Sequence, residues 1–319
     1  MDIFSIILWP IKWVIELILV AFHSLWTFIG MAPDAGITWV LSIVGLVIVV
    51  RAALIPIFVR QIKSQRRMLE VAPQLKKIQD KYKGKKDQFS REAMSRETMD
   101  LYKRTGTNPL SSCLPLLLQM PIFFGLFSVL TDASIHAARG GVGALTPELA
   151  ESFSNAEFLG APLSATFIQA MNAGGPWQVM VVAVVMIILM TASQFITQLQ
   201  IVSKNMSPET KASPMFRQQR ILLYLLPLVF AVSGVAFPLG VMFYWLVSNF
   251  WTMGQQFIVI RNMPTPGSEA AKAREARLAK KGKLVVESPT DATAEQDAEK
   301  KTTQRQQPVS KNRAKKKRK

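Results

Sequence analysis

Long apolar stretches alternate with polar, mostly basic stretches along this chain. A helix needs about 20 apolar residues to cross the hydrocarbon core of a bilayer. The pattern predicts five such crossings, at residues 37–59, 110–130, 177–197, 221–237 and 238–260. The last two form one continuous apolar block with Gly234, Pro238 and Gly240 near its middle, so we expect a tight helical hairpin there. The fold class predicted is an all-α integral membrane protein.

Charge predicts which side of the membrane each connecting segment occupies. Segment 60–107 holds 14 Lys or Arg against 6 Asp or Glu, 201–220 holds 4 against 1, and 261–319 holds 17 against 7. Segment 132–175 holds 1 against 4, and segment 1–36 holds 1 against 3. Because basic segments stay in the cytosol, five crossings with the N-terminus outside and the C-terminus inside fit this alternation.

Residues 1–30 are apolar enough for a sixth crossing, but their polar residues suggest another placement. Asp2, Ser5, Lys12, Glu16, His23 and Thr27 fall close to one helical stripe. Three tryptophans, at positions 9, 13 and 26, suit the headgroup region. We therefore favour an amphipathic helix in the outer interface, with a sixth crossing as the alternative. The five-span core then covers residues 31–260.

The cytosolic segment 60–107 has the pattern of two amphipathic helices separated at Gly84. Val71, Leu75, Ile78 and Tyr82 form the apolar stripe of the first helix. Pro73 lies within this stripe, and we expect it to kink the helix or to begin a new helical segment. The hairpin is either a solvated connector or a mobile arm that contacts apolar partners. The outer segment 132–175 is predicted to be a short extracytosolic loop.

Residues 261–319 contain almost no large apolar side chains, so we expect a disordered tail. The tail ends in "KNRAKKKRK", which suits binding to RNA phosphates or to anionic lipid headgroups without selecting between them. The cations are Lys311, Arg313, Lys315, Lys316, Lys317, Arg318 and Lys319.

Arg51 is a charged residue inside the first predicted span. It lies eight residues before Val59, or about 12 Å below the inner boundary at 1.5 Å per residue. An arginine at the centre of a membrane helix costs at least about 2.5–3.5 kcal/mol, and no predicted span contains Asp or Glu to offset this cost. We therefore expect a water-filled recess that keeps Arg51 hydrated, rather than an arginine that only snorkels.

Other polar side chains in the spans could line this recess. Each alone is typical of a helix–helix hydrogen bond in a membrane. Together with Arg51 they suggest a hydrophilic groove, for which we select Gln119, Ser193, Gln194, Tyr244, Trp245 and Ser248. Met190, Phe195 and Phe250, on the third and fifth spans, form a candidate apolar slide toward the lipid.

Residue counts argue against enzymatic chemistry. The single cysteine, Cys113, excludes an intramolecular disulfide, and the two histidines, His23 and His136, are far apart in sequence. The HExxH, GxSxG and GxxxxGK[ST] motifs are absent from the sequence. We predict no catalytic residue, no metal, no cofactor and no small-molecule substrate.

Three segments resemble the YidC membrane protein insertases, bacterial relatives of the mitochondrial Oxa and chloroplast Albino insertases. "VVRAALIP" (49–56) resembles the arginine-bearing first core span of that family, and "NPLSSCLPLLLQMPIFFGLFSVL" (108–130) resembles its second. "FPLGVMFYWLVSNFWTMGQQFIV" (237–259) resembles its last. Two positions depart from some relatives: Val47 replaces a hydroxyl residue, and Tyr244-Trp245 replaces a tyrosine pair.

The resemblance implies a groove formed by five spans, open to the cytosol and to lipid and closed on the outer side. It implies that Arg51 and Gln119 lie in this groove and that newly made membrane proteins are the substrates. It also implies partnership with the Sec translocon for some substrates, and contact with the ribosome through the basic tail, in a bacterial plasma membrane. The alternative from the residues alone is an anion-selective channel or transporter that uses the Arg51 recess.

Overall fold

The computed structural model describes residues 3–85, 87–107, 114–208 and 227–282, together with residues 211, 221 and 225. Contacts divide the chain into two units, residues 1–274 and residues 275–319. Helix α11 (Glu269–Lys280) contains the described start of the second unit. The basic cluster 311–319 lies outside the described residues.

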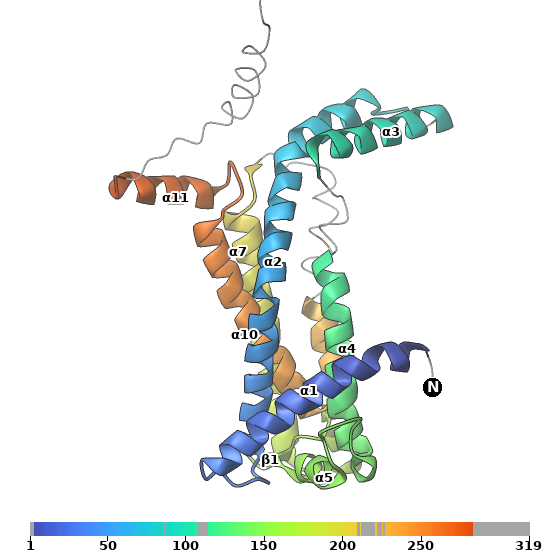
Figure 1. Ribbon diagram of the computed structural model, residues 1–319, viewed down its shortest axis with the longest axis vertical. Coiled ribbons are helices and arrows are strands. Elements are labelled where there is room, and N and C mark those ends of the chain that lie inside the picture. The colour runs from blue at the N-terminus through green and yellow to red at the C-terminus, as the bar shows by residue number, and fades with distance from the viewer. Residues whose placement is uncertain are drawn as a thin grey trace, which may run out of the picture. The chain divides into compact units, whose positions relative to one another are not determined.

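The first unit is a helical bundle. Helices α2 (Gly36–Lys81), α4 (Leu114–Ile135), α7 (Trp177–Lys204) and α10 (Leu239–Asn262) run along the bundle, and α10 packs against the other three (Figure 1). The only strands among the described residues are β1 (Glu157–Phe158) and β2 (Ala161–Pro162), which pair antiparallel. The predicted all-α membrane class is confirmed.

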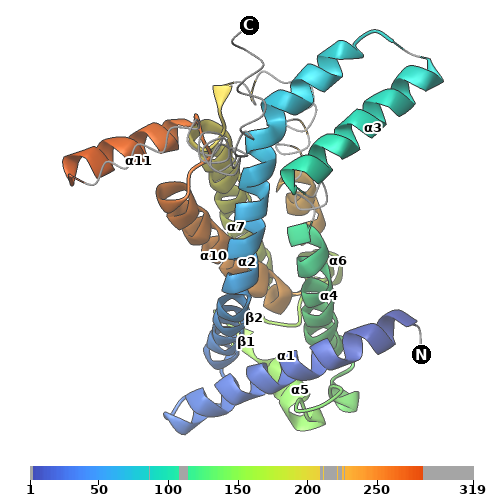
Figure 2. The same ribbon diagram turned by 45° about the horizontal axis from the view of Figure 1, so that its top comes forward.

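Helix α1 (Ile3–Phe28) crosses the bundle instead of joining it. Both views show it running across α2 and α4 at a steep angle, and it packs on both of them (Figure 2). The segment 132–175, called the outer loop after its predicted side, contains η2 (Ala137–Arg139), α5 (Pro147–Asn155) and α6 (Phe167–Ala173), and α5 packs on α4 and η2. The opposite end of the bundle carries α3 (Gln88–Thr105).

Three stretches of the described residues are long and apolar enough to cross a membrane. These stretches are Leu8–Phe28, Gly36–Ser64 and Trp177–Lys204, and Gln119–Ile135 is a shorter apolar stretch. The count of five crossings therefore stays a prediction. Length and composition alone would allow α1 to cross, so its placement in the interface stays a prediction as well.

Helix α2 continues without interruption from the membrane segment into the first arm of the predicted hairpin. We expected a kink or a new segment at Pro73; Pro56 and Pro73 both lie inside the single helix, so no new segment begins there, and the arm of α2 is bent relative to its membrane segment (Figure 2). Pro73 is exposed, so water can bond the carbonyl oxygen that loses its N–H partner. Helix α3 begins after an Asp87 cap that accepts a hydrogen bond from the Ser90 N–H (2.8 Å).

The predicted break near residue 238 is also present. Residues 227–234 are helical, and turn hydrogen bonds at Ala236 and Phe237 end this segment before α10 begins. The N–H groups of Leu239 and Gly240 donate to carbonyl oxygens of the outer loop, at Ala165 (3.0 Å) and Leu163 (2.9 Å). The turn is therefore tied to that loop.

Candidate client-binding recess

Nine residues from four helices enclose a recess in the bundle, called the Arg51 recess below. Helix α2 provides four of them, α4 three, and α1 and α10 one each. They are Ile15, Leu46, Val47, Val50, Arg51, Gln119, Ile122, Leu126 and Tyr244. Four separate helices must pack correctly before these side chains meet, so the recess is a product of tertiary structure.

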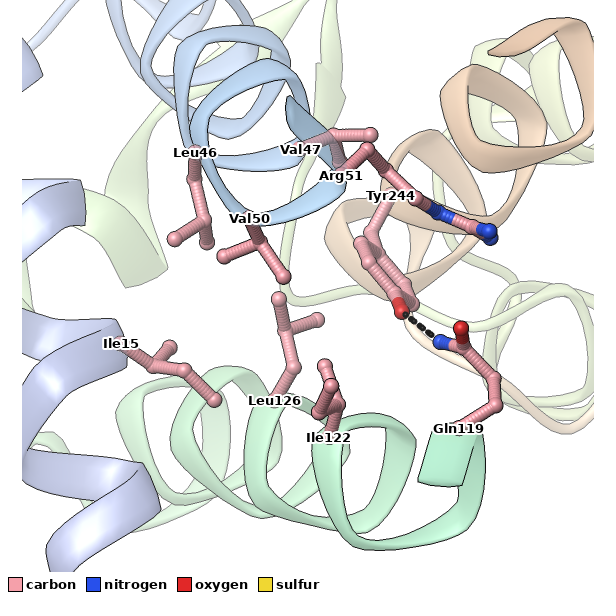
Figure 3. A pocket seen from close by; sticks show the side chains of 9 residues that line it. All are labelled: Ile15, Leu46, Val47, Val50, Arg51, Gln119, Ile122, Leu126 and Tyr244. Carbon is pink, nitrogen blue, oxygen red and sulfur yellow. Dashed lines mark hydrogen bonds between the residues drawn. The ribbon is translucent and has the colours of Figure 1, made fainter. Parts of the chain in front are cut away.

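The polar side chains gather at one end of the recess (Figure 3). Gln119 Nε2 donates a long hydrogen bond of 3.4 Å to the Tyr244 hydroxyl, and Arg51 lies beside this pair. Arg51 is partly exposed, whereas Tyr244 is 5 % exposed. Among the residues that the structure describes, no hydrogen bond or ion pair engages the Arg51 guanidinium. Its donors are therefore available to water or to an anionic group.

The other end of the recess is apolar. Ile15, Leu46, Val50 and Leu126 lie on the side away from the Arg51 guanidinium (Figure 3). The enclosed cavity is about 10 Å³, enough for about one water molecule. The recess thus has a polar end that can be hydrated and an apolar end.

The other predicted groove residues lie elsewhere. The Ser193 hydroxyl donates to the Met190 carbonyl oxygen (2.9 Å) and is buried in α7, while Gln194 lines a second cavity near Pro227 and Phe230. Trp245 packs against Phe123, Phe230 and Phe237, with ring centroids 5.7, 4.7 and 5.8 Å away.

Ser248 and the predicted slide residues complete the set. Ser248 is buried one turn after Tyr244 on α10. Phe195 and Phe250 are 42 % and 44 % exposed, on α7 and α10. Met190 is 4 % exposed and lines the second cavity. Phe195 and Phe250 are therefore exposed apolar side chains, whereas Met190 is buried.

Comparison with known proteins identifies the family. The family model described as 60Kd inner membrane protein matches residues 30–266, about three quarters of the chain. The chain belongs to this family.

Curated relatives support the assignment over nearly the whole length. A membrane protein insertase YidC of Tropheryma whipplei is 44 % identical over 320 residues, covering 98 % of this chain and 97 % of that protein. Its namesake in Streptomyces avermitilis is 46 % identical over 284 residues, covering 88 % of this chain and 63 % of that protein. A Mycobacterium tuberculosis protein of the same name is 32 % identical over 321 residues, covering 92 % and 84 %.

Sequence reasoning missed the part that α1 plays in this member of the family. Ile15 lies outside the region matched by the family model, yet it lines the Arg51 recess. The sequence did carry a signal, because Lys12 and Glu16, on either side of Ile15, are the two Lys, Arg, Asp or Glu residues of a largely apolar helix. Such charges need partners in a membrane protein. The structure provides these partners from α4 and the outer loop.

Proposed function

We propose that this chain is a membrane protein insertase, which transfers hydrophobic segments and short hydrophilic flanks of newly made proteins from the cytosol into the plasma membrane. The family membership supports this function, since the curated relatives cited above carry that name. The observation that carries the proposal is Arg51, a partly exposed cation in an apolar bundle with no described partner.

The Arg51 recess attracts the acidic flank of a substrate. A carboxylate that enters the polar end meets the Arg51 guanidinium at a lower dielectric than in bulk water, so each ion pair is stronger there. Gln119 and Tyr244 supply further hydrogen-bonding groups. Because the present cavity holds about one water, the helices must separate around residue 119 to admit a peptide.

Partition of the substrate helix into lipid supplies the driving free energy. Burial of apolar surface away from water contributes about 25 cal/mol per Å². The exposed side chains of Phe195 and Phe250 offer an apolar path to the lipid on α7 and α10. Neither nucleotide hydrolysis nor a metal is needed for this step, so the mechanism is not enzymatic.

The topology and the further partners belong to the same proposal. The N-terminus lies outside a bacterial plasma membrane, α1 lies in the outer interface, five spans follow, and the C-terminus is cytosolic, as the basic segments favour. The Sec translocon joins for some substrates, and the tail cations bind the ribosome. An anion channel fits less well, because the recess ends in apolar side chains at Ile15 and Leu46.

Substitution of Arg51 tests the electrostatic step. In reconstituted proteoliposomes, Arg51→Lys should keep most insertion of a substrate with an acidic flank, because it keeps the positive charge. Arg51→Glu should abolish this insertion, because like charges repel inside a low-dielectric site. Protease protection of the translocated flank measures insertion.

A substrate with a neutral flank is the matched control for both variants. Its insertion should change little in Arg51→Glu, since no carboxylate is repelled. Full insertion of the acidic substrate by Arg51→Glu would contradict the role of Arg51.

A further inference from the structure

Helix α1 carries a carboxylate that is fully buried against the outer loop. Glu16 is 0 % exposed. Its Oε1 atom accepts a hydrogen bond from the Val142 N–H (2.9 Å), and its Oε2 atom accepts from the N–H groups of Gly143 (2.7 Å) and Leu145 (3.4 Å). Among the described residues no cation forms an ion pair with Glu16. Backbone N–H groups therefore stabilise this charge.

Glycines in the loop make the close approach possible. A Cβ atom at Gly141 would overlap the Glu16 carboxylate, and one at Gly143 would overlap the Trp13 ring. The loop is also closed on itself, because the Gly141 N–H donates to the Leu145 carbonyl oxygen (2.7 Å). The loop backbone thus fits around the Glu16 side chain.

A second polar interaction holds α1 at Lys12, one helical turn before Glu16. Lys12 Nζ forms an ion pair with Asp132 Oδ2 (2.8 Å) and donates to Ser128 Oγ (3.0 Å), both near the end of α4. The Lys12 side chain is 15 % exposed, so this pair is partly shielded from solvent. Since residues i and i+4 share a helix face, Lys12 and Glu16 hold the same face of α1 against the protein.

Helix α1 also packs tightly on α4 and α2 through apolar side chains. Ile15 is 2 % exposed and lines the apolar end of the Arg51 recess. At Gly125 of α4, an added Cβ would lie 2.9 Å from Ile11 Cγ2, and at Gly45 of α2 it would lie 2.5 Å from the Phe22 ring. Both glycines allow α1 to approach closely, so α1 covers the recess directly.

We infer that α1 is a fixed seal and that Glu16 is its positioning residue, a conclusion that rests on the proposed insertase function. The family resemblance already implies closure on the outer side, and Glu16 maintains this closure by holding Ile15 over the apolar end of the Arg51 recess. An insertase needs such closure, because a hydrated arginine site open on both sides would leak ions. Loss of Glu16 should therefore cause a leak before it affects recognition of substrates.

Thiol labelling from the outer side tests the seal in the full-length protein. Val47 lines the recess and is 1 % exposed, so Val47→Cys, in a background with Cys113→Ser, reports whether reagent reaches it. A membrane-impermeant thiol reagent added to the side of α1 should leave this cysteine unmodified when Glu16 is present. In Glu16→Gln the labelling rate should rise about tenfold or more, because the amide presents N–H donors to N–H donors and loses the charge-assisted bonds.

Glu151→Gln is the matched control, since it makes the same change at an exposed carboxylate of α5. Gly141→Val is a second variant, in which residue 16 is still glutamate. It should also raise the labelling rate at Val47→Cys, because the valine side chain displaces the Glu16 carboxylate. Equal labelling in Glu16→Gln and Glu151→Gln, both folded by circular dichroism, would overturn the proposal.

A disulfide between α1 and α4 tests whether Glu16→Gln leaks because α1 is no longer held in place or because the protein is misfolded. The Cβ position at residue 125 lies 3.7 Å from Ile11 Cβ, which suits a disulfide. Proteoliposomes with Glu16→Gln should be permeable to protons. In the Cys113→Ser background, an oxidised Ile11→Cys/Gly125→Cys pair added to Glu16→Gln should lower this permeability to the level of the unsubstituted protein. Reduction of the disulfide should raise it again. Absence of rescue would overturn the role of Glu16.

The oxidised lock also tests whether the seal is fixed. A fixed seal allows normal substrate insertion with the disulfide formed, whereas loss of insertion that returns on reduction would show that α1 moves and would contradict the proposal. Failure of the insertase function itself has another signature. In that case proteoliposomes with the unsubstituted protein would insert no substrate, while the labelling difference at Val47 between Glu16→Gln and Glu151→Gln would persist.

Discussion

Arg51 and Glu16 are stabilised in opposite ways within one apolar bundle. Glu16 is fully buried, and three backbone N–H groups hold its charge. Arg51 is partly exposed, and no described residue forms a hydrogen bond or ion pair with its guanidinium. A buried charge with satisfied hydrogen bonds is structural, whereas a charge with free donors can bind a ligand. This contrast separates the positioning residue from the binding residue.

Leu159 provides a residue-scale prediction about stability. It is 75 % exposed and has φ +54°, in the left-handed region that leucine rarely adopts. Leu159→Asn should raise the free energy of unfolding by about 1 kcal/mol, because asparagine tolerates this conformation better. The thermal unfolding midpoint in detergent measures the change.

Leu159→Val is the control, since a β-branched residue should lower the same midpoint. A lower midpoint for Leu159→Asn would show instead that the exposed leucine contributes a favourable contact with detergent or lipid.

At the scale of elements, one polar contact joins the two arms of the helical hairpin at residues 60–107. Lys81 and the Tyr82 hydroxyl (2.9 Å) both donate to Glu97 Oε1. The hydrogen bond from Lys81, followed by that from Tyr82, lowers the pKa of Glu97, and the same contact with Glu97 raises the pKa of Lys81. The α2 arm and α3 are thus coupled through a group that titrates in acid.

The hairpin should therefore loosen at low pH. A carboxylate with a lowered pKa stabilises the folded form above its unfolded pKa of about 4.3, and this contribution is lost as the pH falls through the lower folded value. Spin labels at the exposed positions Gln79 and Ser95 should give a narrow distance distribution at neutral pH and a broad one in acid.

Glu97→Gln is the matched variant for this experiment. It should broaden the distance distribution at neutral pH, because the ion pair with Lys81 is absent. A narrow, pH-independent distribution in both proteins would mean that apolar contacts of Val71 and Leu101, 7 % and 6 % exposed, suffice to hold the arms together.

At the scale of the whole molecule, the tail cations should govern ribosome binding. Removal of residues 283–319 should weaken co-sedimentation with ribosomes and leave insertion of a completed substrate intact, because the Arg51 recess is unchanged. Each contact between a cation and a phosphate releases counterions and makes binding more sensitive to salt. The shortened protein should therefore bind ribosomes with an affinity that falls less steeply with salt concentration than the affinity of the full chain. Co-sedimentation over a range of salt concentrations measures this.

A variant with a tail of the same length but without the terminal cations tests whether charge or chain length matters for ribosome binding. Replacement of the seven terminal cations by glutamine should weaken ribosome binding, with the clearest loss at low salt. Binding that is unchanged at physiological salt would assign the tail to lipid headgroups instead of RNA. The replaced residues are Lys311, Arg313, Lys315, Lys316, Lys317, Arg318 and Lys319.

Sequence reasoning predicted the elements well where hydrophobic periodicity and chain breakers decide the outcome. The first helix of the hairpin, α2, ends at Lys81 and the second, α3, begins at Gln88, on either side of the predicted break at Gly84. The turn before α10 falls between Gly234 and Gly240, as expected. At Pro73, where we expected a kink or a new segment, α2 continues as one helix that bends between its membrane segment and its arm (Figure 2).

The sequence by itself determined the all-α membrane class, the family, and the presence of a costly cation at position 51, because these depend on local composition and motif. Only the tertiary structure decided that Arg51, Gln119 and Tyr244 share one small recess while Trp245 packs among phenylalanines. It also decided that Glu16 faces the outer loop and Ile15 the recess. The physical reason is that partners distant in sequence, such as Gln119 and Tyr244 or Glu16 and Gly143, are chosen by helix packing and close approach at glycines, which no local pattern encodes.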